Sequence, residues 1–84
     1  MKCYMYTEAG NDVVAAMVEI VTDAVRAGRM DFAGEYLVTM RNKIEETHPE
    51  VWDTAVREAM WKNIAKIIGT KQTEQLAAIV EALI

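Results

Sequence analysis

The sequence predicts an all-α domain built as a compact bundle of four short helices. Signals that interrupt helices are rare, because the 84 residues include only one proline and four glycines. Hydrophobic residues make up 52% of the chain, and they recur at helical spacing in separate stretches. Short gaps divide these stretches, which is typical of consecutive helices that lie against each other. A chain of this length forms one domain.

The first segment, residues 1–10, lacks helical spacing. It is mostly apolar and includes Cys3, Tyr4 and Tyr6. We expect a short extended arm or strand here. A lone strand is not stable in water, so the arm should pack on its own domain or add to another chain.

The first helix is expected at about residues 12–27, with Asn11 as N-cap and Gly28 as the stop. At 100° per residue, its charged residues and Thr22 fall within an arc of about 100°, and its apolar residues fill about 200°. Its valine content would also suit a strand, but the confinement of the charges to one arc favours a helix. Such a wide apolar arc needs more than one neighbour. This helix should therefore be the central helix of the bundle or part of a dimer interface.

The second and third helices are expected at about residues 32–46 and 49–68. Asp31 is a plausible cap for the second helix, which has a single apolar face. Thr47 and Glu50 match a capping box, and Pro49 would lie in the first turn of the third helix. We expect this third helix to place Trp52, Val56, Ala59, Met60, Asn63 and Ile67 on its core face.

The fourth helix is expected at about residues 71–84, after Gly69 ends the third helix. Thr70 or Thr73 is its candidate cap. Leu76, Ile79, Val80 and Leu83 share one face of this helix. The four helices together account for the chain after the arm.

Composition argues against several classes of protein. The net charge of −4 disfavours broad nucleic-acid binding, which depends on Lys and Arg. A single cysteine, Cys3, cannot form an internal disulfide, so a reducing cytoplasm is the expected location. The longest apolar run, Val13–Val18, is far shorter than the about 20 residues of a membrane helix. No signal-peptide pattern is present, so we expect a soluble, unprocessed chain.

No catalytic constellation is found in the sequence. His48 is the only histidine, and the acidic residues around it do not supply a recognisable set of converging metal ligands. Cys3 has no neighbouring base, and no glycine-rich phosphate loop is present. We therefore predict no catalytic, metal-binding or cofactor-binding residues, and we do not expect an enzyme.

Protein–protein interaction is the function that the sequence favours. Tryptophan, tyrosine and methionine are enriched in interfaces, and the chain has two, three and six of them. Trp61 is expected on a flank of the third helix, half exposed, with Ile64 and Ile68 extending the apolar surface beside it. The candidate apolar partner-binding residues are Tyr4, Tyr6, Val14, Val18, Trp61, Ile64 and Ile68.

An acidic cluster is the second candidate surface. It consists of Glu45, Glu46, Glu50 and Asp53, and it could steer the protein to a basic partner. The predicted protein is thus a non-catalytic interaction module, such as a small bacterial or phage-type inhibitor or adaptor. We expect it to form a homodimer and to use no cofactor.

The alternative is a dimeric DNA-binding regulator. The segment around Ala65 and Gly69 resembles a helix-turn-helix, with a small residue in the first helix and a glycine in the turn. The residues that would contact DNA are Lys62, Lys66, Lys71, Gln72 and Thr73. Departures from the motif are the polar Thr70 and Gln75 at positions that are usually apolar.

Overall fold

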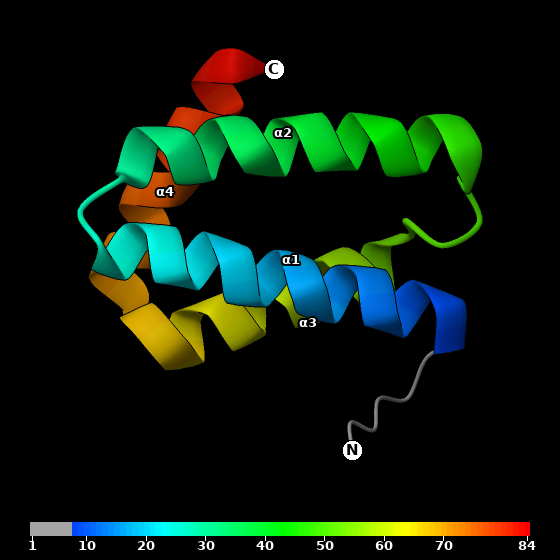
Figure 1. Cartoon of the computed structure of the whole chain (residues 1–84), viewed down its shortest axis with the longest axis horizontal. Helices are drawn as coiled ribbons and strands as arrows, with labels where there is room; N and C mark the ends of the chain where they lie inside the picture. Colours follow the sequence, from blue (N-terminus) through cyan, green and yellow to red (C-terminus); the bar gives the residue numbers. More distant parts are fainter. Residues whose placement is uncertain (1–7) are drawn as a thin grey trace.

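Four helices form the part of the chain that the structure describes (Figure 1). The computed structural model describes the backbone of residues 8–84 and the side chains of residues 13–84. Its helices are α1 (Glu8–Arg26), α2 (Met30–Thr47), α3 (Thr54–Ile68) and α4 (Thr70–Leu83). The predicted all-α bundle is therefore confirmed, and residues 8–84 contain no strand.

The N-terminal arm can be compared with the structure only in part. Residues 1–7, with Cys3, Tyr4 and Tyr6, lie outside the described residues. The sequence pattern places residues 8–10 in the arm, but these residues form the first turn of α1. Asn11 therefore lies inside α1 and is not its N-cap.

The helices are arranged so that α1 and α4 each contact both α2 and α3. In Figure 1, α1 and α2 run alongside each other, and α4 lies steeply across one end of α2. Each helix thus has two main neighbours. Of the two alternatives for α1, the central place in the bundle is therefore not observed, because all four helices have two main neighbours. The other alternative, a place in a dimer interface, stays a prediction.

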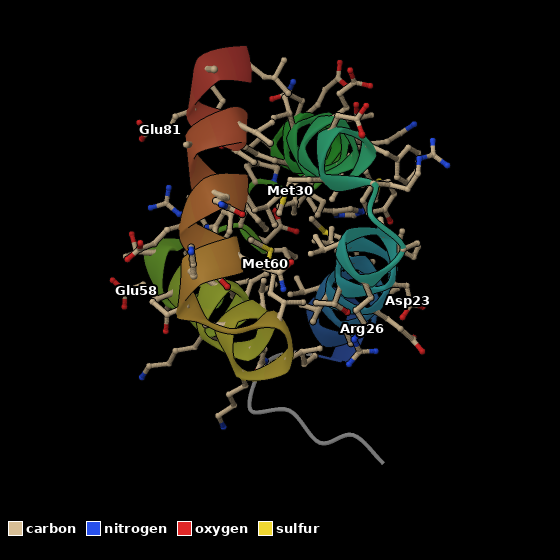
Figure 2. The ribbon with its side chains drawn as sticks, turned by 90° about the vertical axis from the view of Figure 1, so that its left-hand side faces the viewer. Asp23, Arg26, Met30, Glu58, Met60 and Glu81 are labelled. Atoms are coloured by element: carbon tan, nitrogen blue, oxygen red, sulfur yellow. The ribbon has the colours of Figure 1, made fainter. Side chains whose placement is uncertain are left out.

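The hydrophobic core lies in the space between the four helices. Met60 of α3 is 2% exposed, and Figure 2 shows its side chain pointing into this space. All four helices and the α2–α3 connection contribute to the core. Its members are Val14, Met17, Val18, Val21, Val25, Ala33, Leu37, Ile44, Trp52, Val56, Met60, Ile64, Ile68, Leu76 and Val80.

Glycines end α1 and α3, as the sequence predicts. Gly28 has a φ of 81°, its N–H donates to Val25 O at 3.0 Å, and the Arg29 N–H donates to Ala24 O at 2.8 Å. These two bonds form a Schellman motif, in which a left-handed residue lets the chain satisfy the last carbonyls. Gly69, with a φ of 90°, is the only residue between α3 and α4.

The start of α3 differs from the prediction. The helix begins at Thr54, and the Asp53 carboxylate caps it by accepting the Val56 N–H at 2.9 Å. Thr47 is instead the last residue of α2, and its hydroxyl donates to Lys43 O at 2.8 Å. Pro49 lies in the turn between the two helices. The capping box that the sequence suggests is therefore not formed.

The buried face of α3 is correspondingly rotated from the expected one. Residues at a spacing of four, namely Val56, Met60, Ile64 and Ile68, are buried. Ile67 and Asn63, which were expected in the core, are exposed. The expected face assumes that Trp52 belongs to α3. Because Trp52 precedes the helix, its position cannot be used to decide which face of α3 is buried.

Helices α2 and α4 approach each other closely at Gly34. A Cβ atom at this position would overlap Cγ2 of Ile79 and lie 3.3 Å from its Cβ. Gly34 itself is buried in the middle of α2's first half. The absence of a side chain at Gly34 therefore allows α4 to cross α2 where it does.

Candidate interaction site

A pocket of about 270 Å³ opens between α2, α3 and α4. Its deepest residues are core residues, among them Leu37, Met60 and Val80. Trp61 is half-buried and forms part of the accessible wall. The residues that line the pocket are Leu37, Arg41, Trp52, Arg57, Met60, Trp61, Ala77, Val80, Glu81 and Ile84.

Three charged side chains line this α2–α3–α4 pocket. Arg41 of α2 hydrogen-bonds Asn42 Oδ1 at 2.8 Å and lies 3.7 Å from a carboxylate oxygen of Glu45. Arg57 of α3 donates to the Thr54 hydroxyl at 3.3 Å. Among the described residues, neither Arg57 nor Glu81 forms an ion pair.

Both tryptophans of the chain line the pocket. Trp52 lies in the connection before α3 and is 8% exposed. Its indole Nε1 is buried and has no hydrogen-bond acceptor among the described atoms. A buried donor without a partner costs about 1–3 kcal/mol. Buried polar groups usually have partners, so this buried donor is unusual among the described residues.

The predicted apolar partner-binding residues divide into three groups. Trp61 lines the pocket and is half-buried, as expected for a flank. Tyr4 and Tyr6 lie outside the described residues. Val14, Val18, Ile64 and Ile68 are buried in the core. The structure therefore corrects the placement of these last four, because the neighbouring helices already cover them.

All four residues of the acidic cluster are exposed. Two of the carboxylates have cationic or ionisable neighbours: Glu45 contacts Arg41, and a Glu50 oxygen lies 3.4 Å from His48 Nδ1. Asp53 serves as the N-cap of α3. Glu46 has no such contact among the described residues. Because Glu45 and Glu50 are exposed, their pairs contribute little to stability, so Asp53 is the one member of the cluster with a clear structural role.

The residues of the predicted helix-turn-helix lie at the junction of α3 and α4. Lys62, Lys66, Lys71 and Gln72 are exposed, and Thr73 is half-buried. The Gln72 amide donates to Ile68 O at 3.0 Å, and the Thr73 hydroxyl donates to Gly69 O at 2.7 Å. One residue joins the two helices, whereas the motif usually has a turn of about three to four residues. This geometry does not favour the DNA-binding alternative.

Two further features of the described chain bear on function. No three His, Cys, Asp or Glu side chains in it gather in a way that could hold a metal ion. In residues 8–84, no helix has the length and the apolar character needed to cross a bilayer.

The pocket includes residues that no sequence pattern marks as functional. Nothing in the sequence pattern distinguishes Arg41, Arg57 and Glu81 from other charged residues of amphipathic helices, or Ala77 from other helical alanines. They come together only because α2, α3 and α4 pack around one cavity. The one useful signal was tryptophan content, which pointed to Trp61.

Comparison with known proteins identifies no relative. No protein family, no curated protein and no solved structure matches the chain.

Proposed function

We propose that the protein is a non-catalytic interaction module, of the inhibitor or adaptor type, that binds a protein partner at the α2–α3–α4 pocket. The observation that supports this proposal most directly is the position of Trp61. It is half-buried beside a cavity whose base is made of core side chains. Tryptophan and arginine are the residue types most enriched among the dominant contacts of protein interfaces, and the pocket has two of each.

The size of the pocket favours a side chain of a partner over a small molecule. Small-molecule sites usually measure about 300–1,000 Å³, and this cavity lies just below that range at about 270 Å³. A cavity of this size accommodates one or two side chains. Leu83 and Ile84, which are 47% and 66% exposed, extend the apolar surface at the end of α4, and Ile84 also lines the pocket.

The test is affinity capture with variants that alter the pocket in opposite ways. Trp61→Ala removes an accessible wall, and Ala77→Leu places extra atoms at the pocket without removing any core side chain. We expect both variants to lose a protein that the unmodified chain captures, and the complex should re-form from the two purified proteins. Lys66→Ala, on the exposed side of α3, is the matched control and should retain the protein.

Circular dichroism and thermal unfolding would show that each variant is folded. Capture of the same proteins by the unmodified chain and by both folded pocket variants would contradict the proposal. Absence of any captured protein that depends on Trp61 would contradict it as well.

A further inference from the structure

The α3 side of the pocket has an excess of hydrogen-bond donors. The exposed Arg57 guanidinium forms no ion pair among the described residues and donates only to a neutral hydroxyl, at 3.3 Å. A guanidinium has five N–H donors in a planar arrangement that fits a carboxylate in a bidentate manner. An occupant that brings a carboxylate to this side would satisfy the remaining N–H groups of Arg57.

The two arginines of the pocket differ in how available they are. Arg41 is already paired with Glu45 and with the Asn42 side chain. Arg57 has no ion pair among the described residues, although Asp53 lies one turn earlier in the chain. The Asp53 carboxylate is engaged in capping α3, where it accepts the Val56 N–H. Arg57 is thus the cation of the pocket that is open to a partner's carboxylate.

We propose, building on the interaction function above, that the pocket binds a peptide segment of a partner protein in which an acidic residue adjoins an apolar anchor. The anchor occupies the cavity against Trp61, Met60 and Val80. The acidic side chain pairs with Arg57 at the α3 edge. Glu81, on the α4 wall, would repel this acid and would therefore limit the affinity.

Both tryptophans line the pocket, so the intrinsic fluorescence of the protein reports its occupancy without a label. The probe is a library of random dodecapeptides displayed on phage, selected on the full chain and then studied as synthetic peptides. We expect the enriched peptides to have Asp or Glu next to an aromatic or aliphatic residue. Their binding should change the tryptophan emission, and added salt should weaken it.

Charge-neutralising variants give the decisive comparison. Arg57→Gln should lower the affinity for these peptides about tenfold or more, in line with the loss of a charged hydrogen bond. Glu81→Gln should raise the affinity, because it removes a like charge. Lys66→Gln on the same helix changes the net charge as Arg57→Gln does, and it should leave the affinity unchanged.

The inference is overturned if the enriched peptides are neutral or basic, if no peptide is enriched, or if Arg57→Gln binds them as well as the unmodified chain. Those results would not overturn the interaction function, which depends on capture through Trp61 and Ala77. Conversely, acidic peptides that depend on Arg57, together with no Trp61-dependent partner in the capture experiment, would support the chemistry of the pocket and contradict its use for protein binding.

Discussion

Thr22 shows how the core of this small domain accepts a polar side chain. The sequence pattern places it with the charged residues of α1, but it is 2% exposed. Its hydroxyl donates to Val18 O at 2.8 Å and lies 3.2 Å from Glu19 O. A threonine that bonds back to its own helix can lie on a buried face, because it needs no partner from another element. The polarity of Thr22 alone therefore predicts the wrong face of α1 for this residue.

This position gives a prediction about stability. Thr22→Val replaces the hydroxyl with a methyl group of similar shape, so the hydrogen bond and its donor disappear together. We expect a free energy of unfolding that is equal or higher, by up to about 1 kcal/mol, because the Val18 carbonyl still accepts its helical N–H bond and no buried group is left without a partner. Thr22→Ala should lower it, because a cavity is created. Urea unfolding measures both, and a large loss of stability in Thr22→Val would contradict the explanation.

At the scale of elements, the connection between α2 and α3 decides the shape of the pocket. The sequence around this connection has two candidate N-caps for α3, one in Thr47–Glu50 and one at Asp53. The structure uses the second, and this places Trp52 in the connection and Arg57 in the first turn of α3. A helix that began at Pro49 would carry Trp52 on its surface at a different angle.

The two candidate caps can be separated by substitution. Asp53→Ala removes the acceptor of the Val56 N–H and should lower the free energy of unfolding by about 1 kcal/mol, within the usual range of about 0.5–2 kcal/mol for a lost N-cap. Thr47→Ala should have a smaller effect, because its hydroxyl only bonds back to Lys43 O. Chemical denaturation gives both values. A larger loss for Thr47→Ala would favour the capping box.

The elements themselves are predictable from the sequence to a considerable degree. Hydrophobic spacing is a property of each helix, so it locates all four, and Gly28 and Gly69 mark two of the ends because both adopt positive φ. The pocket is not predictable in this way. Its residues come from three helices and one connection, and Arg57 and Glu81 become neighbours of one cavity only through the crossing at Gly34. No sequence feature near Arg57 or Glu81 indicates that α4 crosses α2 at Gly34.

At the scale of the whole molecule, most of the large apolar side chains of residues 13–84 lie in the core or pack against it. Within residues 13–84, the large apolar side chains that stay exposed are Val13, Ile20, Phe32, Ile67, Leu83 and Ile84. Val13 and Ile20 lie two turns apart on α1, with the exposed Ala16 between them, so they form one stripe along that helix. The α1 surface available for the predicted homodimer is therefore this stripe rather than Val14 and Val18.

The homodimer itself stays a prediction, and its interface can now be tested. A standard interface buries about 800 Å² per partner, and three small or medium side chains supply only part of that area. We therefore expect association that is weak and concentration-dependent, with the solution mass rising from micromolar to millimolar concentration. Ile20→Glu should hold the chain at the monomer mass, because a dimer would have to desolvate the new carboxylate.

Ile67→Glu provides the matched control for this experiment. Ile67 is 42% exposed and Ile20 is 40% exposed, so the two substitutions change the net charge and the apolar surface in the same way on different helices. If α1 forms the interface, sedimentation equilibrium should show association for Ile67→Glu but not for Ile20→Glu. A monomeric mass for the unmodified chain at every concentration would contradict the dimer. An equal loss in both variants would mean that general surface hydrophobicity, and not the α1 stripe, causes the association.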